Sequence, residues 1–530
     1  MSFIYKIANQ PAEFDQIKQL NYRTFVEEIP QHEKNETQTL VDKFHEENTY
    51  IICLKEELVI GMICVRSNRP FSLDGKIGEI ERHLPVKVDN PCEIRLLAVD
   101  QKYRNGRVFL GIAQALIRFC LKLGYDAAVI SGTTREQKLY GQMGFQDFAF
   151  ITGNEEAAFQ PMYLTKSTFD AGIAGRILKE QINFLPGPAT ISSEVQLALS
   201  TTPHSHRSKE YEILLHDVQM KLRKLVDAKF VQVLHGTGTL ANDVVAGQLS
   251  LVGGKGLILV NGEFGKRLVD HAERFGLLFD TLEAEWGTVF IEDEIEIKVK
   301  QEKYRWIWLV HCETSTGILN DLEALKTISK HNGSKLAVDC ISSIGTLPIN
   351  LNGVAFASGV SGKALASYTG ISFVFHEEDV KQASSLPRYL DLGAYVESGG
   401  IPYTQSSNLI HALAAALKKY ECPEIVYDQM SHLFNVIRKG VEGVGFTVLA
   451  QKGSTAPTIM TIVPPKGECA QQLGNNLYLN GFSVHYESSY LLEKNWLQIS
   501  CINDVKEKEV SRLLLVMKGL YQSNRQQTLK

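Results

Sequence analysis

The sequence has no long apolar run and no clustered cysteines. Although 44% of its 530 residues are hydrophobic, no stretch resembles a membrane-spanning segment. The start of the chain, Met1 to Lys6, is followed by polar residues and not by the apolar core of a signal peptide. The nine cysteines show no CxxC or Cys/His spacing, which argues against a disulfide framework and against a zinc site. We therefore expect a cytoplasmic protein that binds no metal and no membrane.

The charge balance argues against a nucleic-acid partner. Fifty-five basic and 60 acidic residues give a formal net charge of −5, so the chain has no basic footprint. A chain of 530 residues is too long for one hydrophobic core, and we expect two or more domains. The Gly-containing segment 167–182 is the predicted linker between a domain at 1–166 and a domain at 183–525, which would include a small subdomain at about 427–521.

The strongest chemical signal lies between His311 and Gly370. The apolar runs 306–310 and 335–339 predict buried strands, and the segment 322–331 between them predicts a helix. Ligands of open parallel sheets bind outside the carboxyl ends of the strands. We therefore expect the Thr314 loop, Asp339 and the Lys363 loop to face one crevice in an α/β domain.

Asp339 and Lys363 together suggest pyridoxal phosphate. An Asp at a strand end can hold a proton on a pyridine nitrogen, and a buried, uncharged Lys can form a Schiff base with an aldehyde. For a single Asp or Lys, a helix cap or a surface side chain is the alternative. The motifs 313–317 (Glu-Thr-Ser-Thr-Gly) and 338–343 resemble those of the class V aminotransferases of fold type I. The resemblance is nearest to the 2-aminoethylphosphonate and alanine–glyoxylate transaminases and extends from about Asn183 to the C-terminus.

This resemblance implies a large, mostly parallel α/β domain followed by a small C-terminal α+β domain. It also implies that Lys363 binds the cofactor and moves a proton, while Asp339 keeps the ring nitrogen protonated. The resemblance implies that Thr237, Gly238 and Thr239 form the phosphate loop and that Phe264 and Ile341 cover the two faces of the ring. Thr314 would lie beside the ring hydroxyl. Tyr403 and Ser406 would bind the cofactor phosphate of a partner subunit, which implies a homodimer.

The residues of the phosphate loop suit that role independently. A strand at 230–234 leads through a Gly/Thr turn into a helix at 241–249. Small residues let the backbone approach a phosphate, and a helix N-terminus favours negative charge. Gly362, in contrast, departs from the resemblance, because relatives often place a phosphate-binding Gln directly before the lysine. Desulfurases place a His there, which argues against desulfurase chemistry.

Two positions bear on the substrate. Arg207 could meet an anionic substrate, although a surface arginine is the common alternative. Related transaminases carry a late Arg that binds the substrate carboxylate, whereas the matching strand 496–501 has Gln498. A neutral amide cannot replace a bidentate charged contact. We therefore expect a substrate that lacks an ordinary α-carboxylate or binds it elsewhere.

The N-terminal part predicts a hairpin, a strand at 92–99 and a helix at 108–123 that follows an Arg/Gly loop. Such a loop presents backbone amides to a pyrophosphate. The order resembles the GNAT acyltransferases, and Arg23, Asp42 and the motif 93–96 resemble the branch of acyl-homoserine-lactone and N-acyl amino acid synthases.

The GNAT resemblance implies three site residues. Arg104 and Gly106 would bind the pyrophosphate of acyl-CoA, and Tyr140 would protonate the departing thiolate. A core tyrosine is the equal alternative for Tyr140.

We therefore predict a bifunctional enzyme. One domain would carry out pyridoxal phosphate-dependent transamination of a small amine or amino acid with an oxo-acid. The other would be an N-acyltransferase that uses acyl-CoA or an acyl carrier protein thioester. The alternative is a decarboxylase, lyase or carbon–carbon bond-forming enzyme with a ligand-binding, non-catalytic GNAT-like domain.

Overall fold

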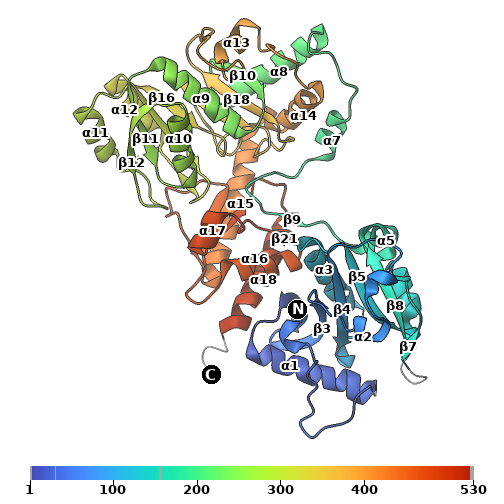
Figure 1. Cartoon of the computed structure of the whole chain (residues 1–530). Helices are drawn as coiled ribbons and strands as arrows, with labels where there is room; N and C mark the ends of the chain where they lie inside the picture. The colour runs from blue at the N-terminus through green and yellow to red at the C-terminus, as the bar shows by residue number, and fades with distance from the viewer. Residues whose placement is uncertain (1–2, 30, 105, 154–157, 526–530) are drawn as a thin grey trace. The chain divides into compact units, whose positions relative to one another are not determined.

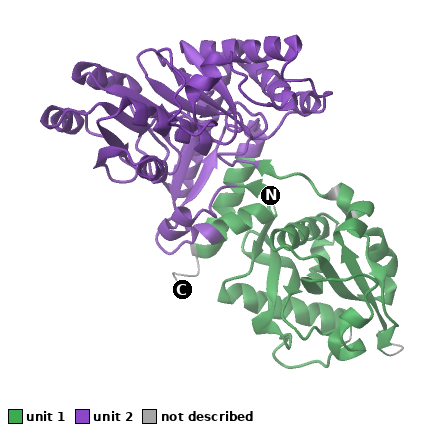
Figure 2. Cartoon of the chain, turned by 45° about the horizontal axis from the view of Figure 1, so that its top comes forward, with its two compact units in different colours: residues 1–182, 472–483, 511–530 green, residues 183–471, 484–510 purple. Residues whose placement is uncertain are grey.

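The computed structural model describes residues 3–29, 31–104, 106–153 and 158–525. The chain forms two compact units (Figure 2). Unit 1 comprises Met1–Ile182, Gln472–Ser483 and Ser511–Lys530, and unit 2 comprises Asn183–Gln471 and Val484–Val510. No helix within the described residues is long and apolar enough to cross a membrane.

Two C-terminal segments cluster with unit 1, and β1 (Ile4–Ile7) supplies the physical reason for one of them. The side chain of Asn480 in unit 1 accepts from the Tyr5 amide at 3.1 Å, and Asn476 accepts from the Ile7 amide at 3.0 Å. These bonds occupy backbone groups of an edge strand. The boundaries predicted near residues 166 and 182 remain predictions.

Unit 2 is built on a seven-stranded sheet with the order β10-β18-β17-β16-β13-β11-β12 (Figure 1). Only β18 runs antiparallel to its neighbours, so the expected mostly parallel α/β fold is confirmed. The strands are β10 (Phe230–His235), β11 (Lys255–Val260), β12 (Leu278–Glu283), β13 (Trp306–Val310), β16 (Lys335–Asp339), β17 (Phe356–Val360) and β18 (Ile371–His376).

Helices cover both faces of this sheet because its strands bury both sides. In β13, Ile307 and Leu309 face one core, while Trp306, Trp308 and Val310 face the other. The first core is closed by α8 (Lys209–Leu225), α11 (Glu292–Gln301), α12 (Leu322–Asn332) and α14 (Ser407–Leu417). The second is closed by α9 (Gly238–Val252), α10 (Glu263–Arg274) and α13 (Leu392–Glu397).

The rest of unit 2 consists of shorter elements. A hairpin of β14 and β15 follows the central sheet strand β13, and a three-stranded sheet of β19, β20 and β22 lies later in the chain. Their bounds, with those of the remaining helices, are α7 (Ser193–Leu199), β14 (Cys312–Glu313), β15 (Ile318–Leu319), α15 (Pro423–Val444), β19 (Thr447–Val448), β20 (Ile459–Val463), α17 (Ser489–Lys494) and β22 (Leu497–Ser500).

Unit 1 contains an eight-stranded sheet in which β4 and β5 form the one parallel pair among its described pairings. That pairing covers only Pro91–Glu93 against Ala127–Val129, so the two strands separate beyond Glu93. The strands after β1 are β2 (Thr49–Lys55), β3 (Leu58–Arg66), β4 (Pro91–Val99), β5 (Ala127–Thr133), β6 (Gln146–Asp147), β7 (Thr152–Gly153) and β8 (Ala158–Thr165). This mixed α/β arrangement agrees with the GNAT-like expectation.

The helices of unit 1 begin with α1 (Pro11–Tyr22), which continues as a π-helix over Arg23–Glu28. The others are α2 (Asp74–Ile77), α3 (Arg107–Lys122), α4 (Gln137–Gln142), α5 (Lys166–Ala171) and α6 (Ile173–Ile177). The chain passes between the units within α16 (Ala470–Leu479) and α18 (Glu507–Arg525).

His311, directly after β13, makes the stability of the fold sensitive to acid. Burial lowers the pKa of its imidazole to about 4, whereas an unfolded histidine titrates near about 6.5. Between these values the unfolded state binds more protons, so the free energy of unfolding falls as the pH falls. The wild-type free energy of unfolding should fall between pH 7 and pH 5, and His311 should account for about 2 kcal/mol of that fall. We expect His311→Asn to lose about 2 kcal/mol less over the same range. Denaturant unfolding at both pH values measures this, and an equal loss in both proteins would contradict it.

Candidate active site

A cavity of about 310 Å³ lies in unit 2. Its walls come from loops that follow β10, β13, β16 and β17, together with residues of the C-terminal part of the unit. Six residues predicted from the sequence line it: Thr237, Gly238, Phe264, Thr314, Ile341 and Lys363. The predicted crevice at the carboxyl ends of the strands is therefore present.

Asp339 is the last residue of β16 and is 4% exposed. Its carboxylate accepts hydrogen bonds from the Asn242 side chain at 2.8 Å and from the Ile341 amide at 2.9 Å. Burial raises the pKa of Asp339, and these two hydrogen bonds act against that effect. A cationic ring nitrogen would supply the opposite charge that a buried carboxylate requires.

Asn242 is a site residue that the sequence analysis missed. It lies in α9, and the Ser358 hydroxyl donates to its side-chain oxygen at 2.7 Å. This leaves its NH₂ group directed at Asp339. The available signal was a polar residue among the apolar residues of the predicted helix 241–249.

Lys363 follows β17 and contacts the loop after β13 through a hydroxyl chain. Its Nζ donates to Ser342 Oγ at 2.6 Å, and Ser342 Oγ lies 2.5 Å from Thr314 Oγ1. Burial lowers the pKa of the Lys363 ammonium, which favours the neutral amine that attacks an aldehyde. The same Nζ lies 5.5 Å from the centroid of the Phe264 ring.

The first turn of α9 fits a phosphate group. Thr237 occupies the N-cap position, and no side chain caps this turn, so helix amides remain available to an anion. A Cβ atom at Gly238 would lie 2.5 Å from Ile341 Cδ1, so a larger residue here would displace the end of the Ile341 side chain, which lines the cavity. Phosphate, ring nitrogen and aldehyde can each be matched to the residues present, and the site fits pyridoxal phosphate.

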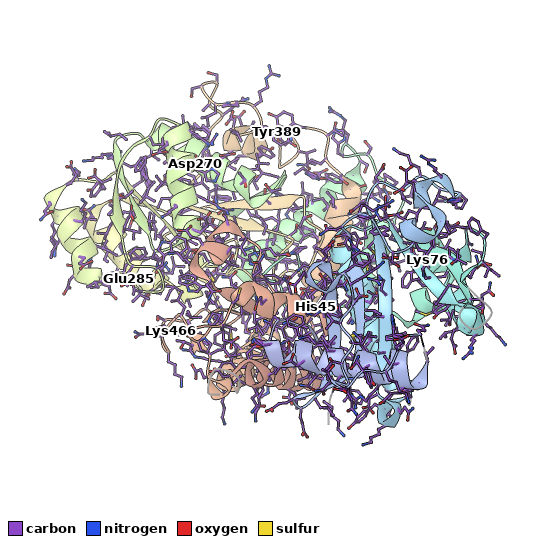
Figure 3. The ribbon with its side chains drawn as sticks, turned by 60° about the horizontal axis from the view of Figure 1, so that its bottom comes forward. His45, Lys76, Asp270, Glu285, Tyr389 and Lys466 are labelled. Atoms are coloured by element: carbon purple, nitrogen blue, oxygen red, sulfur yellow. The ribbon has the colours of Figure 1, made fainter. Side chains whose placement is uncertain are left out.

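Six predicted residues of unit 2 lie outside the cavity wall: Asp339 and Gln498 are buried behind it, and Thr239, Arg207, Tyr403 and Ser406 lie elsewhere. Thr239 and Arg207 are exposed. Tyr403 donates to the Arg388 carbonyl at 2.7 Å and stacks on Tyr389, which Figure 3 labels. Ser406 accepts from the Leu409 amide at the start of α14. Their predicted contacts with cofactor or substrate remain predictions.

Gln498 is fully buried behind the cavity wall. Its NH₂ group donates to the Thr314 carbonyl at 2.6 Å and to Thr461 Oγ1 at 2.9 Å. Its oxygen accepts from His485 Nδ1 at 2.9 Å and from the Tyr490 hydroxyl at 3.3 Å. His485 and Tyr490, which the sequence analysis missed, line the cavity in its place.

The hydrogen bonds of His485 fix its neutral tautomer. The amide oxygen of Gln498 can only accept, so His485 Nδ1 carries the proton. Its Nε2 then accepts from the Ser488 hydroxyl at 2.7 Å. Burial lowers the pKa of His485 and keeps the ring uncharged. Among the described lining residues Lys363 is the one lysine or arginine, so this wall offers a substrate no second cation.

In unit 1 the predicted acyltransferase residues occupy separate places. Tyr140 in α4 is half-buried, and its ring meets Phe145 edge to face at 6.4 Å. Burial raises the pKa of its hydroxyl. Arg104 pairs with Glu28 at 2.5 Å, and Gly106 is the N-cap of α3 with a φ of +79°. Asn105, part of the predicted Arg/Gly loop, lies outside the described residues.

The sheet of unit 2, with a lysine and a carboxylate at its carboxyl edge, defines a fold-type I, pyridoxal phosphate-dependent enzyme. Comparison with known proteins then gives the family. The aminotransferase class-V family matches residues 194–414, and the family N-acyl amino acid synthase FeeM matches residues 16–167.

Individual proteins and a solved structure are also similar to this chain. The 2-aminoethylphosphonate–pyruvate transaminase of Pseudomonas aeruginosa is 34% identical over 249 residues, which cover 44% of this chain and 67% of that protein. The soluble hydrogenase 42 kDa subunit of Anabaena cylindrica is 29% identical over 53% of this chain and 78% of that protein. The alanine–glyoxylate aminotransferase structure from Nostoc sp. superimposes with a TM-score of 0.59 and 26% identity, over 64% of this chain and 95% of that one.

The chain belongs to the class-V aminotransferase family, whose members use pyridoxal phosphate. It also carries an N-acyl amino acid synthase domain in its N-terminal part. Both resemblances found in the sequence are therefore confirmed, and the chain is a fused aminotransferase and acyltransferase.

Asp339→Asn tests the carboxylate at the ring-nitrogen position. A neutral amide has one acceptor oxygen, so it keeps one of the hydrogen bonds from Asn242 and the Ile341 amide, and it cannot hold a cationic ring. We expect cofactor to bind and turnover to fall on the order of 10²-fold or more. Steady-state kinetics with saturating cofactor measures this loss. Near-normal turnover would show that Asp339 is not the partner of the ring nitrogen.

Proposed function

We propose that unit 2 transfers an amino group from a primary amine without an α-carboxylate to an oxo-acid. We further propose that the acyltransferase domain acylates an amine, with acyl-CoA or an acyl carrier protein thioester as donor. The observation that carries the first part is the buried Gln498 and the uncharged wall in front of it. We also propose that the protein acts in the cytoplasm.

Each step at the amino group has a residue in reach. When bound, pyridoxal phosphate supplies an aldehyde for the amine and a ring that withdraws electrons. Lys363, with its lowered pKa, is suited to hold the cofactor and to move a proton at the reacting carbon. Asp339 keeps the proton on the ring nitrogen. Phe264 in α10 and Ile341 in the loop after β16 both line the cavity, and their positions suit contact with the two faces of a flat ring.

The preference for an amine without an α-carboxylate follows from the cost of burying an unpaired charge. His485 is neutral, and the Gln498 side chain is occupied on both ends. A carboxylate placed against this wall would lose water and gain no cationic partner. The 2-aminoethylphosphonate transaminase relatives are named for an amine of the favoured kind.

For unit 1, two features support an acyltransferase. The divergence of β4 and β5 beyond Glu93 leaves unpaired strand edges where an extended ligand could bond. A second, mostly apolar cavity of about 80 Å³ lies beside α3 and includes Ile94, Leu116 and Phe145, which suits an apolar group. The alternative of a non-catalytic, ligand-binding domain is favoured by one contact, the pairing of Arg104 with Glu28.

A homodimer is part of the proposal for unit 2. Tyr403 and Ser406 do not line the cavity of their own chain. This placement suits the role implied by the resemblance, in which they reach the cofactor phosphate of a partner subunit.

The proposed donor class is tested in the donor half-reaction, by comparing 2-aminoethylphosphonate with alanine for transfer of the amino group to bound pyridoxal phosphate, with no acceptor present. We expect the second-order rate constant of this half-reaction to be at least about tenfold higher for 2-aminoethylphosphonate, because alanine holds its carboxylate on the reacting carbon, next to the uncharged wall, whereas the phosphonate lies one carbon further away. Product formation is followed by mass analysis, and Lys363→Ala is the inactive control. Equal use of alanine would contradict the proposed substrate class.

Tyr140→Phe tests the acyltransferase. Burial keeps the Tyr140 hydroxyl protonated, so it can donate a proton to a departing thiolate. We expect amine-dependent thiol release from acyl-CoA to slow at least about tenfold, with acyl-CoA affinity unchanged. A thiol-reactive dye and equilibrium binding measure the two quantities. Loss of folding in the variant would favour the core-tyrosine alternative, and an unchanged rate would exclude Tyr140 as the donor.

A further inference from the structure

Glu313, the residue before Thr314, carries a fully buried carboxylate for which the mechanism above has no use. Among the described residues, no lysine, arginine or histidine forms an ion pair with it. Burial of an unpaired charge is costly. A carboxylate kept in such a place requires other compensation.

That compensation comes from hydrogen-bond donors. The Glu313 carboxylate accepts from the Gly265 amide at 2.9 Å and from the Phe264 amide at 3.3 Å, both in the first turn of α10. The Ser315 hydroxyl and amide donate to it at 2.5 and 3.1 Å. Burial raises the pKa of Glu313, and these hydrogen bonds at the positive end of the α10 dipole act against that effect and stabilise the carboxylate.

The fit around this carboxylate is tight. A Cβ atom at Gly262 would collide with the Glu313 side chain and would lie 2.5 Å from Ser315 Oγ. The Ser315 hydroxyl in turn accepts from the Glu263 amide at 2.9 Å. The start of α10 is thus joined to the loop after β13 at several points, and it cannot shift without breaking them.

Both joined elements carry cavity residues. Phe264 belongs to the bonded turn, and Thr314 lies between Glu313 and Ser315. We propose that Glu313 is a positioning residue: its carboxylate fixes the Phe264 ring and the Thr314 loop at the cavity and adds a second buried negative charge to that of Asp339. This inference rests on the proposed cofactor site of unit 2.

The charge has a consequence apart from position. Glu313 and Asp339 both act to raise the pKa of Lys363 against the effect of burial. Removing the Glu313 charge should therefore make a proton on Lys363 or on its bond to the cofactor easier to lose. A role limited to packing would not move this property.

The experiment compares wild type, Glu313→Gln and a control, Glu285→Gln, which changes an exposed glutamate of the same unit (Figure 3). Each protein is freed of cofactor and titrated with pyridoxal phosphate. The pH midpoint of the visible cofactor band is then measured. For Glu313→Gln we expect about tenfold weaker cofactor binding and a midpoint lowered by up to about one pH unit. The control should match wild type.

The outcomes separate this inference from the proposed function. If wild type binds no pyridoxal phosphate, the proposed cofactor site fails. If wild type binds it and Glu313→Gln keeps both affinity and midpoint, only the role of Glu313 is overturned. If Glu313→Gln does not fold, Ser315→Ala decides, because it removes one donor and leaves the charge. We expect Ser315→Ala to weaken binding with an unchanged midpoint, and unchanged binding would overturn the proposal.

Discussion

The 2.8 Å hydrogen bond between Asn242 and Asp339 joins the two halves of the aminotransferase site. Asp339 ends β16, and Asn242 lies in α9, whose first turn is the proposed phosphate position. The bond therefore fixes the distance between the proposed partner of the ring nitrogen and that turn. It requires β16 and α9 to pack closely, which the apolar residues of α9 and of the sheet face that it covers achieve.

The parallel strands of unit 2 could be predicted from the sequence because each strand is marked by its own run of apolar residues. Runs such as 306–310 are apolar throughout, as strands covered on both faces must be. The order of the strands is different in kind, since it depends on contacts between distant segments. The antiparallel strand β18, inserted between β10 and β17, has no signal in its own residues.

The same distinction separates the site residues that were predicted from those that were missed. Asp339 was predicted because it ends an apolar strand beside polar residues, and Lys363 because it lies in a loop rich in Ser and Gly. His485 and Tyr490 reach the cavity from the C-terminal part of the chain, and only the fold brings them there. Gln498 was singled out as a departure from the resemblance, but its place behind the cavity wall, hydrogen-bonded to the lining residues Thr314 and His485, could not be read from a strand pattern.

The arrangement of charge gives the site its chemical character. Two buried carboxylates, Asp339 and Glu313, lie near a single lysine whose ammonium form is disfavoured by burial. When pyridoxal phosphate is bound, its cationic ring nitrogen would balance the first carboxylate, and the N-terminus of α10 balances the second. Neither carboxylate then requires an arginine or a second lysine in the cavity wall. In the proposed function, His485 and Tyr490 would select the substrate by shape and hydrogen bonding.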